Sequence, residues 1–122
     1  MTVRGIQRVI VSVADLGPAL GLYRDALGFT EKYRAEEVAM LGAPGGDFEL
    51  LLHQRPPTPG LHGVAVTYLV DDVDEVTAAA QKAGATVVDP PGDQPWGERQ
   101  AVLTDVDGHV FCLVSPAVSS KR

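Results

Sequence analysis

The side chains that could do chemistry in this 122-residue chain are few and scattered. His53 could be a polar pocket residue or a general base, or simply a solvated histidine at a strand end. His62 lies beside a Pro/Gly-rich stretch and His109 follows a DVDG turn, so both occupy ordinary polar positions. The single cysteine, Cys112, is a nucleophile only where a cation or a helix N-terminus lowers its pKa. No His–Asp pairing is evident from the spacing, which favours an inert, buried thiol.

Four of the candidate side chains are expected on strand faces that point away from the helices. Successive residues of a strand point to opposite faces of its sheet. In each strand the apolar residues at alternate positions are expected to pack against helices. The opposite faces then carry Arg8, Glu49, His53 and Cys112. A single bulge would reverse this assignment within its strand.

The elements that position these residues begin with a strand and a helix. Segment Ile6–Val13 is rich in β-branched residues and predicts a strand. Asp15 is a suitable N-cap for a helix whose apolar residues recur at helical spacing up to Leu27, and Gly28 is placed to end it. Shorter strands are expected at 29–34, 37–41 and 47–53.

The same pattern returns after Pro56–Gly60, a stretch expected to be a linker because it suits neither a helix nor a central strand. A strand at 63–70 precedes Asp72, which is expected to cap a second helix that Gly84 closes. Further strands are expected at about 85–89, 98–104 and 109–115, with PPGDQPWG as a loop. The motifs VADL and VDDV lie 57 residues apart. This offset favours an internal βαβββ duplication over two unrelated strand–helix units.

Composition excludes several classes of protein. The chain is 45% hydrophobic and 21% charged, which is enough apolar material for a folded core. A net charge of −6 argues against nucleic acid or an anionic membrane as a partner. No apolar run approaches the roughly 20 residues that span a bilayer, and the opening MTVRGIQ lacks a signal-peptide core. One cysteine excludes a disulfide framework, so a cytoplasmic globular protein is expected.

Several motifs together resemble one family. The stretches VIVSVADLGPALGLYRDALGF, VTYLVDDVDEV and WGERQAVLTDVDGHVFCLVSP are similar to the vicinal oxygen chelate superfamily, which includes glyoxalase I, bleomycin-resistance proteins and extradiol dioxygenases. Val106 stands where that family usually has proline. The resemblance implies an α+β fold in a single domain spanning 1–122. Two tandem βαβββ modules, at about 5–55 and 61–116, would form half-barrels around a cavity with the helices outside. It also implies a homodimer.

Enzymes of this family hold a divalent cation with histidines and carboxylates at four inward strand positions. The resemblance places these positions at Arg8, Glu49, Ala65 and Cys112. Only Glu49 keeps a family ligand, and one hard carboxylate with one soft thiol beside an arginine does not make a site for Mg²⁺, Mn²⁺, Fe²⁺ or Ni²⁺. We therefore expect no metal cofactor, and neither glyoxalase I nor dioxygenase activity.

The candidate binding residues each have two interpretations. Arg8 and Glu49 could form a buried ion pair, or Arg8 could anchor a polar or anionic ligand group. Trp96 could anchor its loop over the core, or form a planar wall for an aromatic ligand, as the similar loop of bleomycin-resistance proteins implies. Arg99 could pair with an acid near the turn or line the pocket mouth.

The sequence thus predicts a metal-independent protein that binds a small organic molecule, such as an antibiotic or a metabolite that it sequesters. The predicted ligand-binding residues are Arg8, Glu49, His53, Trp96, Arg99 and Cys112. One alternative is a metal-free lyase or isomerase that uses Glu49 or His53 as general base. The others are a metalloenzyme with ligands at unexpected positions, such as Glu49 with His53, and a subunit that only binds a partner.

Overall fold

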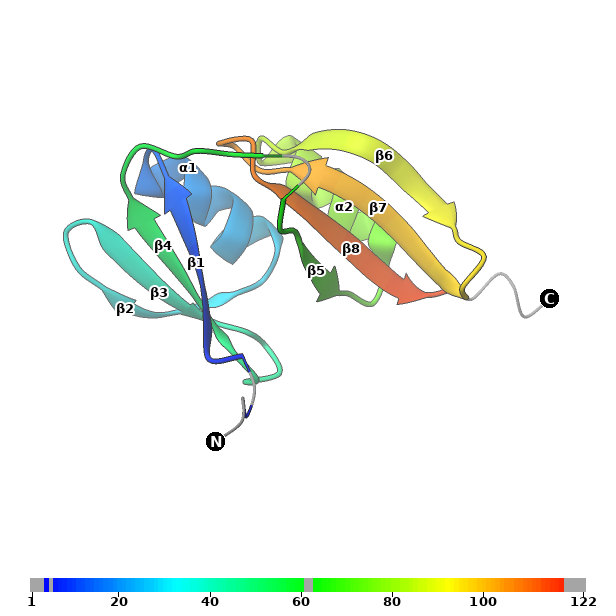
Figure 1. Cartoon of the computed structure of the whole chain (residues 1–122), viewed down its shortest axis with the longest axis horizontal. Coiled ribbons are helices and arrows are strands. Elements are labelled where there is room, and N and C mark those ends of the chain that lie inside the picture. Colours follow the sequence, from blue (N-terminus) through cyan, green and yellow to red (C-terminus); the bar gives the residue numbers. More distant parts are fainter. Residues whose placement is uncertain (1–3, 5, 61–62, 118–122) are drawn as a thin grey trace. The chain divides into compact units, whose positions relative to one another are not determined.

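A computed structural model describes residues 4, 6–60 and 63–117. The chain divides into two compact units, Met1–Thr58 and Pro59–Arg122, which are described separately below (Figure 1). The boundary falls inside the predicted linker, and residues 56–60 form neither helix nor strand. His62 and the tail at 118–122 lie outside the described residues. A single domain for the whole chain stays a prediction.

The first unit is a four-stranded sheet with one helical segment. Its strands lie in the order β1 (Arg8–Val13), β4 (Glu49–Gln54), β3 (Val38–Gly42) and β2 (Thr30–Arg34). β1 and β4 run parallel, and the other two neighbouring pairs are antiparallel. Parallel neighbours need a crossover, and the helical segment after β1 provides part of it.

The core of this unit lies between the sheet and the helical segment. Alternate residues of β3 and β4 are completely buried, namely Ala39, Leu41, Leu50 and Leu52. The helical segment contributes Leu16, Ala19, Leu20, Leu22 and Tyr23. The predicted alternation is therefore confirmed: the residues between these positions, Glu49, Leu51 and His53 among them, lie on the other face, which we call the open face of the first sheet.

The helical segment differs from the prediction in its second half. Asp15 caps it as predicted, accepting a hydrogen bond from the Gly17 amide at 3.1 Å. However, α1 (Leu16–Leu20) continues as η1 (Gly21–Ala26), a π-helix, rather than as an α-helix. The amide of Leu27 donates to the carbonyl of Leu22, five residues earlier, at 2.9 Å. This wider turn buries Leu22 together with its neighbour Tyr23, which explains why a strict 3.6-residue period was wrong here.

The second unit repeats the arrangement. Its strands lie in the order β5 (Val66–Leu69), β8 (Val110–Pro116), β7 (Glu98–Thr104) and β6 (Thr86–Asp93), with β5 and β8 parallel. Helix α2 (Val73–Lys82) is capped by Asp72, whose side chain accepts from the Glu75 amide. The buried side chains between this helix and the sheet include Tyr68, Val73, Ala80, Ala101, Leu103, Phe111 and Leu113.

β6 corrects the sequence prediction. The strand was expected to stop near residue 89, before the Pro/Gly-rich stretch, but it runs through Pro90, Pro91 and Gly92 to Asp93. Its pairing with β7 is irregular at two points within 87–92. Proline removes a donor from the ladder, and β6 lies at the edge of the sheet, where one side needs no donors.

Both units therefore have the βαβββ order, and the fold class is α+β as predicted. In each unit the helical segment contacts the strand that pairs in parallel with the first strand, α1 with β4 and α2 with β8. Among the described residues, no helix is long and apolar enough to cross a membrane.

Candidate functional site

A carboxylate held by two cations is the central feature of the open face of the first sheet. Arg8 of β1 lies directly opposite Glu49 of β4 in the parallel register. The guanidinium Nη2 of Arg8 donates to Oε1 of Glu49 at 3.0 Å, and Lys32 Nζ lies 3.3 Å from Oε2 of the same carboxylate. Each oxygen of Glu49 thus has its own cationic partner.

The ion pair between Arg8 and Glu49 was one of the two interpretations of these residues, and the structure contains it. It is not buried, however, because the two side chains keep 38% and 24% of their surface exposed. Burial is expected if both side chains point into an enclosed cavity. In the first unit the pair lies on the open face of the sheet, opposite the apolar neighbours that point to the helix side.

Lys32 is a site residue that the sequence prediction missed. The register between β2 and β3 shifts between Glu31 and Tyr33, and this bulge lies at Lys32. The stem of Lys32 then crosses Gly42 of β3, where a Cβ atom would lie only 2.7 Å from Lys32 Cδ. Since Gly42 is paired with Glu49, this path leads the ammonium group directly to the carboxylate.

The two cations further favour the ionised form of Glu49. Hydrogen bonds from Arg8 and then from Lys32 lower the pKa of the Glu49 carboxyl below its usual value, against the small opposing effect of desolvation. The group is therefore ionised at neutral pH. A general base works best when its pKa lies near the working pH, so Glu49 is a weak one.

A pocket of about 470 Å³ adjoins this carboxylate at one end of the sheet. It is formed by the start of β2, the end of β3 and the loop that joins β3 to β4. Its lining residues are Gln7, Thr30, Lys32, Gly42, Ala43, Gly46, Asp47, Phe48 and Glu49. The pocket lies wholly within the first unit, and it combines one ammonium group, two carboxylates and one aromatic ring.

His53 lies on the same face as Glu49 but far along the strand. It is paired with Ser12 of β1 and Val38 of β3. It lies four positions along the strand from Glu49, which amounts to roughly 13 Å between the two Cα atoms. The structure therefore does not bring Glu49 and His53 together as ligands of one ion. Between them lies an apolar row across the sheet, formed by Ile10, Leu51, Met40 and Tyr33.

In the second unit, Cys112 is half-buried on the side of the sheet away from α2. Its neighbours across the sheet are Thr67 and Val102, and neither carries a charge. The only Lys or Arg residues among the described part of this unit are Lys82 and Arg99. Arg99 is engaged by two acids on the helix side, so it is not available to activate the thiol, and the interpretation as an unreactive cysteine is favoured.

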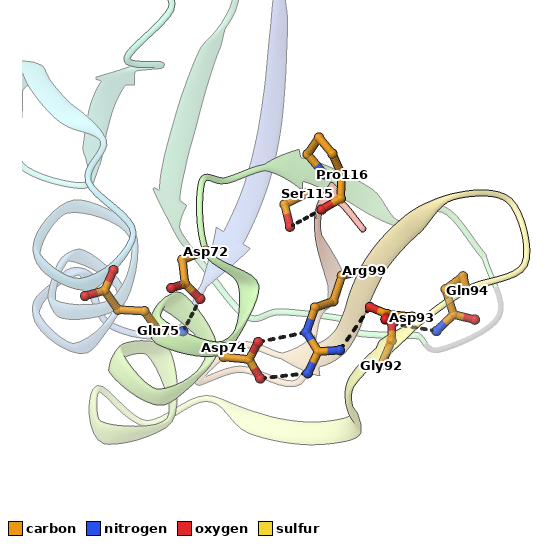
Figure 2. Close-up of polar contacts among 9 residues, drawn as sticks. All are labelled: Asp72, Asp74, Glu75, Gly92, Asp93, Gln94, Arg99, Ser115 and Pro116. Carbon is orange, nitrogen blue, oxygen red and sulfur yellow. Dashed lines mark hydrogen bonds and ion pairs between the residues drawn. The ribbon is translucent and has the colours of Figure 1, made fainter. Parts of the chain in front are cut away.

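Arg99 lies on the helix side of the second sheet. There it pairs with acidic residues, and such pairing was one of the two interpretations of this residue. Its Nε and Nη2 donate to the two carboxylate oxygens of Asp74 in α2 at 2.7 and 3.0 Å, and its Nη1 donates to Asp93 at 3.0 Å (Figure 2). These hydrogen bonds raise the pKa of Arg99 and lower that of Asp74. The bidentate contact holds the start of α2 against β6 and β7.

Trp96 stands in the turn between β6 and β7 with 60% of its surface exposed. Its indole Nε1 donates to Oε1 of Glu98 at 2.8 Å. The turn itself is held by a hydrogen bond from the Gly97 amide to the Gln94 carbonyl, and Gly97 has a φ of 93°. A side chain this exposed does not seal the core, so the structure gives no support to the loop-anchor interpretation.

Comparison with known proteins gives the class of this chain. Residues 5–113 match the family model described as the Glyoxalase/Bleomycin resistance protein/Dioxygenase superfamily. The chain belongs to this superfamily, as its motifs predicted.

One curated relative matches most of this chain. CFP32 of Mycobacterium tuberculosis is 36% identical in an alignment of 104 positions, which covers 81% of this chain but only 39% of that protein. The chain thus spans less than half the length of this curated relative.

Solved structures share the fold over nearly the whole chain. A superfamily member from Sphaerobacter thermophilus is 26% identical with a TM-score of 0.72, covering 93% of this chain and 98% of that one. TioX from Micromonospora is 27% identical with a TM-score of 0.71, covering 92% and 98%. A glyoxalase-related enzyme from Fulvimarina pelagi has a TM-score of 0.80 at 18% identity over 95% and 91% of the two chains, a likeness of fold alone.

The residues at the family's metal positions do not fit a divalent cation. The carboxylate of Glu49 is shared between two cations, one of which, Arg8, itself stands at a ligand position. A metal ion there would meet two positive charges and would have to displace both from the carboxylate. Ala65 has no donor atom and Cys112 offers a soft thiol. Within either unit, the described residues form no cluster of three His, Cys, Asp or Glu side chains suited to a metal.

Proposed function

We propose that this chain is a metal-independent protein that binds a small organic molecule reversibly. The observation that carries the proposal is the Glu49 carboxylate, which pairs with two protein cations at a position where the family resemblance implies a metal ligand, next to a pocket of about 470 Å³. A pocket of that size suits a small ligand, and the apolar row beside it offers a surface for the ligand's hydrophobic part.

Binding is favoured over catalysis by the state of the candidate base. The lowered pKa of Glu49 makes it a poor proton acceptor for a lyase or an isomerase. His53 lies beyond the apolar row, at the other end of the strand, away from the pocket residues. Sequestration of an antibiotic or of a metabolite is the form of binding that we propose, without a chemical step.

Each unit carries proposed binding residues of its own. Arg8, Glu49 and Lys32 would fix a polar group in the first unit, and Leu51 would contact the apolar part. In the second unit, the exposed ring of Trp96 is suited to stacking on a planar group. Arg99 is left out of the proposed site because both of its acidic partners lie on the helix side.

A homodimer is also part of the proposal. Several large apolar side chains outside the proposed ligand surface are exposed, among them Val64, Leu69 and Val88. Exposed apolar side chains of this kind are typical of a surface that binds another protein chain, here a second copy of this one. A cytoplasmic location, which the single cysteine favours, stays a prediction.

Ligand-observed NMR with a library of small organic molecules tests the proposed function. We expect ligands to bind to protein that has been dialysed against EDTA. Their affinity should lie within about twofold of the affinity measured in the presence of Mn²⁺ or Ni²⁺. Met40→Lys places a charge in the apolar row and is expected to weaken binding at least about tenfold. Arg99→Met is the matched control on the helix side of the other unit and should bind normally. Binding that requires a metal, or turnover that Glu49→Gln abolishes, would contradict the proposal.

A further inference from the structure

We infer that the open face of the first sheet has a second polar anchor, formed by Arg55, Ser12 and His53, which takes the carboxylate of an organic acid. We call these three residues the arginine end of the open face, because they lie at the end of β4 opposite to the pocket. This inference rests on the proposed function and names the class of its ligand. The ligand is a small organic acid whose apolar body lies on the apolar row.

The backbone places Arg55 on the open face. Its amide donates to the carbonyl of Val13 at 2.9 Å, so the hydrogen bonding between β1 and β4 continues one residue beyond the end of β4. Because successive strand residues alternate between faces, residue 55 belongs to the same face as His53. The side chain agrees with this assignment, since its Nε donates to Oγ of Ser12 in β1 at 2.6 Å.

The charge of Arg55 is not neutralised by an acid within the described residues of its own unit. Arg8 and Lys32, near the pocket, both pair with Glu49. Arg55 makes no such ion pair in residues 4 and 6–58, and its side-chain partner there is the hydroxyl of Ser12. A hydroxyl does not cancel a charge, so this end of the face keeps one full positive charge at an exposed position.

The donors at the arginine end suit a carboxylate. A guanidinium has five N–H donors in a planar fork, and the contact with Ser12 uses Nε. The two terminal nitrogens then face a ligand with the spacing that binds both oxygens of a carboxylate. His53 is paired with Ser12 across the two strands, and its ring has an N–H donor in either protonation state. One positive charge also matches a carboxylate better than a doubly charged phosphate.

The apolar row begins directly beside the arginine end. Ile10 and Leu51 lie two residues before Ser12 and His53 on the same face, and they are paired with each other. Ile10 keeps 55% of its surface exposed, so this part of the row has apolar area left to cover. An apolar surface next to a single cation is complementary to an acid with an apolar body and a carboxylate at one end.

Three probes with the same apolar body and different charge test this inference: 4-phenylbutyrate, 4-phenylbutyramide and 4-phenylbutylamine. Each is titrated into the full-length ¹⁵N-labelled protein. The amide shifts of Ile10 and Leu51 report contact with the apolar row, and those of His53 and Arg55 report contact with the arginine end. We expect 4-phenylbutyrate to bind most tightly and to shift both groups of amides.

Arg55→Met should weaken the binding of 4-phenylbutyrate at least about tenfold, the usual loss for a charge-assisted hydrogen bond, and leave 4-phenylbutyramide unchanged. Arg55→Lys keeps the charge and should retain the preference for the acid over the amide. Arg34→Met is the matched control, because Arg34 lies at the same end of the sheet but pairs with Glu31 and is aligned with the buried Ala39. This control should bind the acid normally.

Equal affinities for the acid and the amide, tighter binding of the amine, or an unchanged affinity of Arg55→Met for the acid would overturn the assignment of a carboxylate. The proposed function would stand in each of these cases if the probes still shift the amides of Ile10 and Leu51. If none of the three probes shifts any of the four amides, the inference is overturned and the apolar row loses its place in the proposed function as well.

Discussion

Leu50→Ala is expected to lower the free energy of unfolding by about 2–5 kcal/mol, whereas Leu51→Ala should cost about 1 kcal/mol or less. The two residues are identical in type and adjacent in β4, so they differ only in the face that they occupy. Leu50 is completely buried between the sheet and the helical segment, and its truncation leaves a cavity in close-packed surroundings. Leu51 lies half-buried on the open face.

Urea denaturation followed by circular dichroism measures this difference. The Leu51→Ala variant has a second expected effect, because its side chain belongs to the apolar row next to the pocket: it should weaken ligand binding while the protein stays folded. Equal losses of stability in the two variants would show that the faces of β4 are assigned wrongly, and the open-face site would then be untenable.

Asp105→Ala is expected to cost about 2–4 kcal/mol of stability, the second large effect. Asp105 is nearly fully buried at the turn between β7 and β8. Its Oδ1 accepts hydrogen bonds from the amides of Asp107 and His109, both at 2.9 Å. Alanine would leave these two amides in a partly buried turn without their acceptor, and desolvated donors are costly.

Two variants control this experiment in thermal or urea unfolding. Asp105→Asn keeps an oxygen at the same position and should lose less stability than Asp105→Ala. Asp71→Ala removes an exposed acid from the same unit and should be close to neutral. If Asp105→Ala matched Asp71→Ala, the carboxylate would have no role in holding the turn.

Much of the fold was predictable because it follows local rules. Alternating apolar residues predicted the strands, and the capping aspartates Asp15 and Asp72 predicted both helix starts. The two main errors came from tertiary context. The π-helix at Gly21–Ala26 buries Leu22 and Tyr23 together, which a 3.6-residue period does not predict. The extension of β6 through Pro90 and Pro91 depends on its place at the sheet edge, which no local pattern reveals.

The candidate site was predictable only in part. Strand alternation predicted that Arg8 and Glu49 both point away from the helices. The parallel register of β1 and β4 then sets them opposite each other. Lys32 could not be predicted, because its approach to Glu49 requires a bulge in β2 and a glycine on the neighbouring strand. Strand alternation alone would also have placed Arg99 on the helix side, had it been applied to β7.

The two cations on Glu49 connect the sequence to the proposed function. The resemblance places Arg8 at a position where the family has a metal ligand, and in this structure Arg8 is the counter-ion of Glu49. In the proposed function, the same carboxylate is part of an organic binding site, where it would act as a structural anion that holds Arg8 and Lys32 in place.

The most direct test of this account is native mass spectrometry of the purified protein before and after incubation with Ni²⁺, Zn²⁺ and Mn²⁺. The spectrum reports metal, co-purified ligand and oligomeric state together. We expect twice the chain mass for the proposed homodimer, with no divalent cation retained at one ion per chain, and an added mass only from small organic molecules. Retention of one such ion per chain, lost again in Glu49→Gln, would show that Glu49 is a metal ligand and would contradict the central claim.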